Sequence, residues 1–359
     1  MTGSNLQEAA ALRGDCFFLW INRTGIVSLF IGEHMKTNAI IFEKIGGPEV
    51  LKYVPIQVDE PKAGEVFIRH HAIGVNFIDT YYRSGLYETQ LPSVLGFEAA
   101  GVVEQIGSGV THVKPGDRVA YAQGPLGAYA EHRVIPGNFV VKIPDAVSFE
   151  DAASVMLKGL TVSYLFQDIF PVKKNDLFLF HAAAGGTGII ACQWARHLGA
   201  RLIGTVSSEE KAKSAKENGA SFTINYSNED IVKRVMEISE NKKLAVVFDG
   251  VGKSTWTQSL DCLAPRGLMV SFGNASGAVT GVSLSELASR GSLFVTRPML
   301  WAYMNTPEKL SQASAQLFDL VAQGIIRPGV SEKLSLKDAG RAHENLLDRS
   351  RVGSLLLIP

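Results

Sequence analysis

Residues 176–211, DLFLFHAAAGGTGIIACQWARHLGARLIGTVSSEEK, contain the pattern that decides the fold. Residues 177–180 are apolar and predict a short buried strand. Ala183, Gly185 and Gly188 then follow with the spacing of the G-x-G-x-x-G turn, in which alanine replaces only the first glycine. A strand that leads into this turn predicts the binding of a dinucleotide cofactor.

The helix after the turn supports the same interpretation. It is predicted from about Thr187 to Leu198, and Gly199 is a typical residue just beyond a helix end. Gly185 would let the backbone approach a pyrophosphate, and Gly188 would let the helix pack closely on the strand. The N-terminus of the helix would offer unpaired N–H groups and the positive end of its dipole to the phosphates.

The end of the second strand indicates which dinucleotide binds. Residues 201–206 form this strand, and Ser207, Ser208 and Lys211 follow it. Proteins that bind NAD place an acidic residue here for the ribose hydroxyls, whereas hydroxyls and a lysine fit a 2′-phosphate. The sequence therefore predicts NADPH.

Three neighbouring residues leave alternatives open. Glu209 and Glu210 fit the first turn of the next helix, where the helix dipole favours acidic residues, but either could instead face the ribose. Lys211 has the alternative of being an ordinary solvated lysine of that helix.

Composition narrows the class of protein. A chain of 359 residues with 46% hydrophobic residues predicts two domains with substantial cores. The formal net charge is zero and 19% of residues are charged, which does not favour nucleic acid or an acidic membrane surface as a partner. Three cysteines cannot build a disulfide framework, and their sparse use fits a reducing cytoplasm.

The first 34 residues are predicted to be an extension without a catalytic role. Residues 16–32 are apolar, but Asn22, Arg23 and Thr24 interrupt them, so they lack the unbroken run of about 20 residues that a membrane helix needs. We expect no membrane anchor. The folded protein is predicted to begin at Met35.

The rest of the chain predicts an α/β fold. Short strands punctuated by Gly, Pro and Asp predict a mainly β domain, and strands that alternate with helices then predict a doubly wound parallel sheet. An amphipathic helix is expected at 309–323, before a final strand. We expect a catalytic domain formed by 35–158 and 299–359, and a cofactor domain formed by 159–298.

A set of motifs carries a resemblance to a known family. In chain order they are IGGPEVL, AIGVNFIDTYYRSGLY, LGFEAAGVVEQIGSGV, KPGDRVAY, LGAYAEH, LKGLTVSYL, HAAAGGTG and SFGNASGAVTG. Together they resemble the zinc-independent quinone oxidoreductases, zeta-crystallin-like members of the medium-chain dehydrogenase/reductase superfamily. The resemblance implies a GroES-like catalytic domain, a Rossmann cofactor domain, a homodimer, NADPH as donor and a quinone as acceptor.

Zinc-containing members of the same superfamily provide a contrast. Their cysteine ligand resembles the position of Asn76, and their histidine ligand resembles the position of Phe97. Phenylalanine has no donor atom and a carboxamide is a poor zinc ligand, while a catalytic zinc needs about three protein ligands. We therefore expect no metal.

Without a metal, hydrogen-bond donors must polarise the acceptor. The resemblance places Asn76, Tyr81 and Tyr87 at the mouth of the cleft, and these are our candidate catalytic residues for positioning the substrate. The alternatives are that Tyr81 only packs and that Asn76 caps a helix that begins near Phe77. His181, His70 and His71 are expected to be structural.

The resemblance also assigns the cofactor-binding positions. On the nicotinamide side these are Phe77, Ile78, Asp79, Thr80, Tyr81, Thr161 and Tyr164; at the pyrophosphate Gly185, Gly186, Thr187 and Gly188; at the adenosine end Ser207, Ser208, Lys211 and Tyr226; after later strands Gly250, Phe272, Gly273 and Asn274; and, as looser transfers, Phe294, Val295, Thr296 and Arg349. Arg349 has the alternative of being a surface charge.

Three functions are consistent with the sequence. The first is an NADPH-dependent quinone reductase, and the second is an NADPH-dependent reductase of activated double bonds such as enones. The third is an NADPH-binding protein without catalytic activity. A quinone needs little activation by the protein, because it is already a strong electron acceptor.

Overall fold

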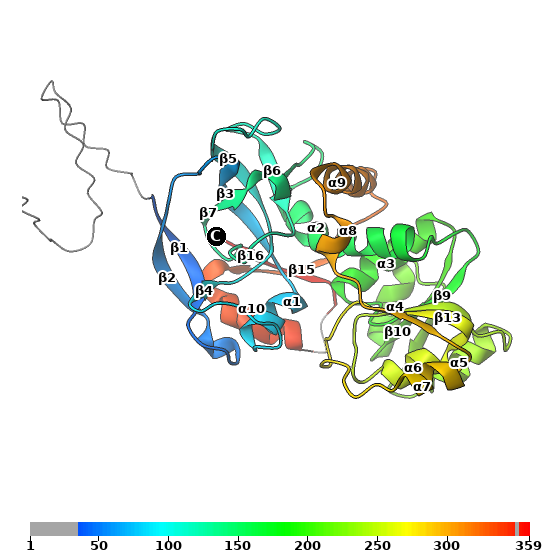
Figure 1. Cartoon of the computed structure of the whole chain (residues 1–359). Coiled ribbons are helices and arrows are strands. Elements are labelled where there is room, and N and C mark those ends of the chain that lie inside the picture. Colours follow the sequence, from blue (N-terminus) through cyan, green and yellow to red (C-terminus); the bar gives the residue numbers. More distant parts are fainter. Residues whose placement is uncertain (1–34, 349–351) are drawn as a thin grey trace, which may run out of the picture.

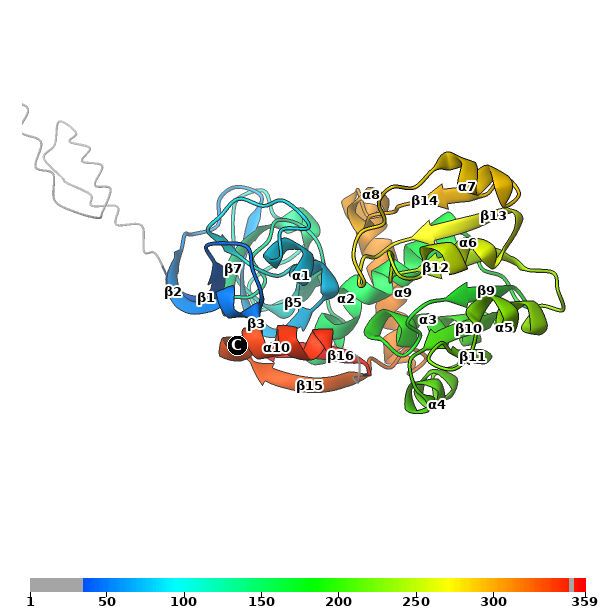
Figure 2. The same cartoon turned by 90° about the horizontal axis from the view of Figure 1, so that it is seen from below.

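The computed structural model describes residues 35–348 and 352–359. The predicted N-terminal extension and Arg349 lie outside these residues. Two bodies lie side by side: a mainly β part formed by the beginning and the end of the chain, and a part built on a parallel sheet from its middle (Figures 1 and 2). The polypeptide crosses between them through helix α2 (Phe149–Tyr164).

The mainly β part contains two sheets. The strands of the smaller sheet, in order, are β2 (Lys52–Val58), β1 (Met35–Phe42) and β4 (Ser93–Val94). The larger sheet has the order β15 (Val330–Ser335), β16 (Ser354–Ile358), β3 (Glu65–Val75), β5 (Glu98–Ile106), β6 (Arg118–Tyr121) and β8 (Val141–Lys142), and β7 (His132–Pro136) also pairs with β3. Strand β16 pairs with β3 from far away in the sequence, which explains why strand patterning returns at the end of the chain.

The second body is a six-stranded parallel sheet. Its order is β11 (Phe222–Asn225), β10 (Arg201–Val206), β9 (Leu177–Phe180), β12 (Leu244–Asp249), β13 (Leu263–Ser271) and β14 (Phe294–Thr296). The helices of this part are α3 (Gly186–His197), α4 (Glu209–Glu217), α5 (Ile231–Ile238), α6 (Trp256–Asp261) and α7 (Leu284–Ser289). Chain order reverses between β9 and β12, and a doubly wound sheet binds its ligand beside such a point, at the carboxyl ends of the strands.

Helix α2 lies between the two bodies. Ser148 caps its N-terminus by accepting a hydrogen bond from Asp151 N, and most of its residues are buried because it packs on β3 and β5 as well as on α3 and α9 (Pro307–Ala322). The domain boundary proposed between residues 158 and 159 lies within this helix. Helices α1 (Phe77–Arg83), α8 (Leu300–Tyr303) and α10 (Ala339–Leu347) complete the α-helices of the described chain.

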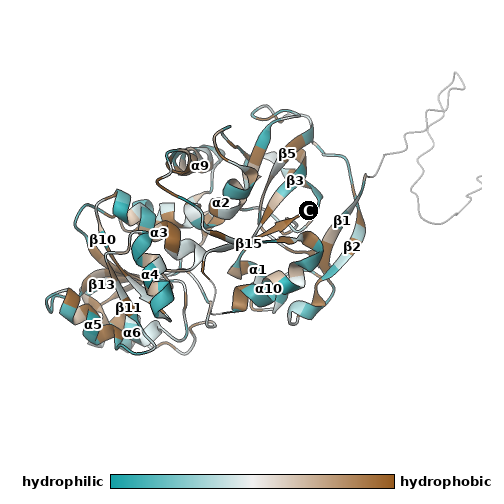
Figure 3. Cartoon of the chain, turned by 180° about the vertical axis from the view of Figure 1, so that it is seen from behind, coloured by the Kyte–Doolittle hydropathy of each residue, from teal (hydrophilic) through white to brown (hydrophobic). Residues whose placement is uncertain are grey.

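The surface helices α4 and α10 carry hydrophilic stretches (Figure 3). In the ranges that the structure describes, no helix is long and apolar enough to span a membrane. The expected helix 309–323 corresponds to α9, and the expected strands 177–180 and 201–206 are β9 and β10.

Candidate functional site

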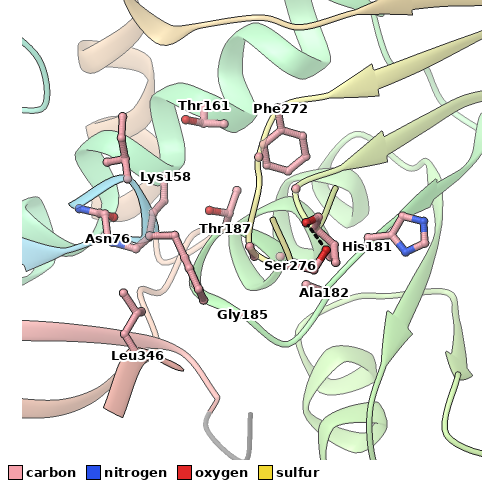
Figure 4. Close-up of a pocket in the computed structure, with 18 of the residues that line it drawn as sticks. Asn76, Lys158, Thr161, His181, Ala182, Gly185, Thr187, Phe272, Ser276 and Leu346 are labelled. Carbon is pink, nitrogen blue, oxygen red and sulfur yellow. Dashed lines mark hydrogen bonds between the residues drawn. The ribbon is translucent and has the colours of Figure 1, made fainter. Parts of the chain in front are cut away.

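A cavity of about 740 Å³ opens between the two bodies. One wall comes from α1, α2 and the end of α10, and the other comes from the loops at the carboxyl ends of β9, β10, β12 and β13. Figure 4 shows Asn76 on the first wall, and the Lys158 side chain reaching from this wall to the glycine turn, where a Cβ atom at Gly186 would lie 3.0 Å from its Cδ and Cε atoms. The cavity therefore lies where the doubly wound sheet is expected to hold a ligand.

The glycine turn forms the floor of the cavity. Helix α3 begins at Gly186 with Gly185 as its N-cap, and all residues from Gly185 to Gly188 line the cavity. A Cβ atom at Gly188 would lie 2.3 Å from the carbonyl oxygen of Ala182. The helix thus packs as closely on the turn as the sequence predicts, and its first N–H groups lack intrahelical partners.

A buried hydrogen-bond network holds the loops at this edge of the sheet. His181 is hydrogen bonded to Thr205 Oγ1 and to Ser259 Oγ, each at 2.9 Å. Ser259 and Thr255 both donate to Asp249 Oδ2, at 2.8 and 2.7 Å. Burial lowers the pKa of His181, which favours the neutral ring. His181 lines the cavity with both ring nitrogens hydrogen bonded, and its purely structural role stays a prediction.

The expected 2′-phosphate corner lies at the end of β10. Ser207, Lys211 and Tyr226 all line the cavity there. Ser208 does not line it, because its hydroxyl is the N-cap of α4 and accepts a hydrogen bond from Lys211 N at 3.3 Å. The cavity therefore presents a hydroxyl, a phenol and an ammonium group at this corner.

The two glutamates beside this corner belong to the helix. Glu209 and Glu210 form the first turn of α4, and neither lines the cavity. Glu209 Oε1 accepts a hydrogen bond of 2.8 Å from Asn225 Nδ2. Their negative charges thus lie at the favourable end of the helix dipole.

Asn76 is at the start of α1 and also lines the cavity, and its role in positioning the substrate stays a prediction. It is the N-cap residue of α1, and its backbone N donates to Asp79 Oδ2 at 2.8 Å. Asn76 and Asp79 form a capping box, and Asn76 Nδ2 also donates to Glu98 Oε2 at 2.8 Å. Asn76 is buried and lines the cavity.

Tyr81 and Tyr87 line the cavity and also connect its two walls. The Tyr81 hydroxyl accepts a hydrogen bond of 2.9 Å from Asn274 N, and the Tyr87 hydroxyl accepts one of 2.9 Å from Arg297 Nη2. Each hydroxyl keeps its own hydrogen for donation. Burial raises the pKa of Tyr81 to about 12, so that it remains a donor at neutral pH.

Two predicted cofactor residues of α1 face away from the cavity. Asp79 is completely buried, accepts a hydrogen bond of 2.9 Å from the Tyr129 hydroxyl, and has a pKa that burial raises to about 7. Thr80 donates to the carbonyl oxygen of Phe77 at 2.7 Å. Both side chains are therefore occupied with the helix and the core beneath it.

The remaining predicted positions divide into two groups. Phe77, Ile78, Thr161, Tyr164, Gly250, Phe272 and Gly273 line the cavity. Asn274 does not line it, but its backbone holds Tyr81. Phe294, Val295 and Thr296, which the resemblance linked to the cofactor less directly, form strand β14 at the edge of the sheet and lie outside the cavity.

The sequence did not predict several residues that line the cavity. Lys158 lines it from α2 and Arg297 from the loop after β14. Ser331 and the segment 345–348 contribute from the end of the chain. The one available signal was the lysine among the mostly apolar residues in the middle of α2, since the other residues are brought here only by tertiary packing.

The prediction that the protein binds no catalytic metal rests on two residues of the cavity. Asn76 and Phe97, at the positions that resemble zinc ligands, both line the cavity. Among residues 35–348 and 352–359, no group of three or more His, Cys, Asp or Glu side chains could hold a metal ion. The absence of a metal stays a prediction.

Comparison with known proteins places this architecture in a family. Residues 62–145 match the alcohol dehydrogenase GroES-like domain, and residues 186–316 match the zinc-binding dehydrogenase family. The chain is 56% identical over 324 residues to quinone oxidoreductase 1 of Escherichia coli, a match that covers 89% of this chain and 99% of that protein. The chain belongs to the quinone oxidoreductase family of the medium-chain dehydrogenase/reductase superfamily.

Two further matches describe the range of this family. The solved structure of the Escherichia coli quinone oxidoreductase complexed with NADPH has a TM-score of 0.89 and 55% identity, and the match covers 90% of this chain and 100% of that one. A 2-haloacrylate reductase from a Burkholderia species is 44% identical, over 89% of this chain and 98% of that protein. The family and the fold class predicted from the sequence are thus confirmed.

Proposed function

We propose that the protein is an NADPH-dependent quinone reductase that works without a metal. The observation that carries the proposal is a single cavity that joins the glycine turn and the Ser207–Lys211 corner to the donors Asn76, Tyr81 and Tyr87. The relatives support it, because they are quinone oxidoreductases and one of them forms a complex with NADPH.

The residues of the cavity fit NADPH. The N-terminus of α3 offers backbone N–H groups to the pyrophosphate, and Thr161 and Tyr164 of α2 would border the nicotinamide. Ser207, Lys211 and Tyr226 would hold the 2′-phosphate, where a carboxylate would repel it. Bound NADPH supplies the reducing equivalents.

The acceptor end of the cavity fits a flat carbonyl compound. Phe272 and Phe97 provide apolar surface, and the Tyr81 and Tyr87 hydroxyls can donate to a carbonyl oxygen. A quinone held against the nicotinamide in this geometry needs little further activation.

The test is steady-state oxidation of NADPH with a panel of quinones and a panel of enones and haloacrylates. We expect turnover of quinones. The 44% identical 2-haloacrylate reductase favours reduction of activated double bonds as the second candidate, and turnover of that panel alone would replace our proposal by it. Tight binding of NADPH without turnover of either panel would indicate a non-catalytic protein.

We further propose a homodimer that forms through β14. This strand is one edge of the parallel sheet, and the residues Phe294 and Val295 are 60% and 39% exposed, with Leu284 of α7 nearby in sequence at 79%. An exposed apolar edge strand offers unpaired backbone groups to a second copy. Val295→Lys should yield monomers in light scattering, and unchanged dimers would assign the interface elsewhere.

We also propose a cytoplasmic location. The described cysteines, Cys192 and Cys262, are buried free thiols, and such thiols persist in a reducing compartment. Fractionation of cells that express the full chain would test this, and recovery outside the cytoplasmic fraction would contradict it.

A further inference from the structure

The wall of the cavity contains a buried ion pair. Lys158 Nζ lies 3.3 Å from Glu98 Oε2, and the two side chains are 7% and 0% exposed. Burial of such a pair has a desolvation cost of several kcal/mol per ion, and apolar residues of similar volume often stabilise a fold equally well. Its position beside a ligand cavity therefore points to a role in function.

Glu98 is held in one orientation. Its Oε1 accepts a hydrogen bond of 2.7 Å from Leu157 N, and its Oε2 accepts from Asn76 Nδ2 as well as from Lys158. Gly74 provides the necessary space, because a Cβ atom there would lie 2.1 Å from Glu98 Oε2. The carboxylate thus fixes two cavity residues, Asn76 and Lys158, relative to each other.

The Lys158 ammonium group retains hydrogen-bonding capacity. It has three N–H donors, and Glu98 is its one hydrogen-bond partner within the described ranges. Lys158 and Asn76 lie next to each other at the cavity (Figure 4). Asn76 stands at a position that resembles a zinc ligand in metal-containing members of the superfamily. A positive charge is therefore kept close to the place that lacks metal ligands.

We propose that Lys158 is a further catalytic residue, whose ammonium group donates a hydrogen bond to the acceptor oxygen while negative charge builds up on it. The inference rests on the proposed quinone reductase activity. Overall, NADPH, quinone and one proton from solvent give NADP⁺ and hydroquinone; the quinone gains two electrons, and Lys158 keeps its own proton. Donors fixed in advance in a site shielded from water stabilise such charge most strongly.

The first test uses a double variant, Lys158→Met with Glu98→Gln, which removes the charge without leaving a buried carboxylate unpaired. Weakly oxidising quinones depend most on stabilisation of the charge, so we expect kcat/KM to fall about 10- to 100-fold for them. The fall should be less than about 3-fold for the strongest oxidants. The single variant Lys158→Arg keeps the positive charge, so its kcat/KM for weakly oxidising quinones should fall less than that of the double variant.

A matched control replaces an ion pair of the surface. Lys309→Met with Asp168→Asn removes a pair of 2.8 Å, neither member of which lines the cavity, and should leave all rates unchanged. A uniform loss across the quinone series in the Lys158 double variant would indicate a merely structural role and overturn the proposal. If that variant fails to fold, Lys158→Gln removes the charge while it keeps a donor for Glu98, and the same outcomes apply.

A second test does not depend on turnover. 4-Nitrophenol changes its absorbance on ionisation and imitates an acceptor oxygen that carries charge. In the complex with NADP⁺, the wild type should bind the phenolate about 10-fold more tightly relative to the phenol than the double variant does. Equal preference in both proteins, or no binding by either, would overturn the role of Lys158. Failure of the proposed function would appear separately, as a wild type that reduces no quinone.

Discussion

Lys211 offers the sharpest test of the cofactor assignment. It lies in the first turn of α4, after the N-cap Ser208, where the helix dipole opposes a positive charge by about 0.3–1 kcal/mol. Lys211→Ala should therefore not destabilise the fold. Lys211 is half-buried at the cavity, and a hydrogen bond to a charged group contributes about 1.5–3 kcal/mol, so we take about 2 kcal/mol for a partly solvated contact.

This energy corresponds to an increase of about 30-fold in the Kd of NADPH. The Kd of NADH should change less than about 3-fold, because NADH has no 2′-phosphate. Fluorescence titration of both cofactors measures the difference. Lys213→Ala is the matched control, because Lys213 belongs to the same helix, is 78% exposed and lies 4.0 Å from Glu217. Equal weakening of NADPH and NADH by Lys211→Ala would refute the reasoning.

Three further predictions follow from the described contacts. Gly188→Ala should lower the Tm and raise the Kd of NADPH at least about tenfold, because its Cβ would lie 2.3 Å from Ala182 O; unchanged values would contradict the close packing. Burial raises the pKa of Asp79 to about 7 from 3.8, so the folded protein holds a proton that the unfolded chain releases between about pH 4 and 7. Stability should fall by up to about 4 kcal/mol as the pH rises through this window, and Asp79→Asn should remove the fall; parallel Tm profiles of both proteins would exclude it. Dialysis against a chelator should leave quinone turnover intact, because Asn76 and Phe97 replace metal ligands, and a loss restored by zinc would disprove this.

The cofactor half of the site could be predicted because its signal is local. The strand 177–180, the glycine turn and the helix that begins at Gly186 occupy one continuous segment, and the periodicity of each element is visible in the sequence. The parallel order of the sheet follows from alternating strands and helices joined by right-handed connections. Packing elsewhere in the chain does not override these signals.

The sequence assigns two residues of α1, Asp79 and Thr80, to the cofactor although they do not line the cavity, and the geometry of a helix explains this difference. Five consecutive residues, 77–81, were assigned to the cofactor as a block, although a helix turns by 100° per residue. Phe77, Ile78 and Tyr81 share the face that lines the cavity, and Asp79 and Thr80 face the opposite way. Ser208 was also assigned to the cofactor but does not line the cavity, because its hydroxyl caps the N-terminus of α4.

The role of Lys158 could not have been assigned from the sequence, although the lysine itself stands out there, because its ion pair depends on residues far along the chain. Glu98 lies on β5 and Gly74 on β3, in the mainly β part, while Leu157 and Lys158 belong to α2. One turn further along, the same helix carries Thr161 to the cofactor side of the cavity. The carboxylate of Glu98 therefore ties Asn76, at the start of α1, to helix α2. Its hydrogen bonds to Leu157 N, Asn76 Nδ2 and Lys158 Nζ keep this carboxylate in place, and a side chain at position 74 would displace it, because a Cβ atom there would lie 2.1 Å from Glu98 Oε2.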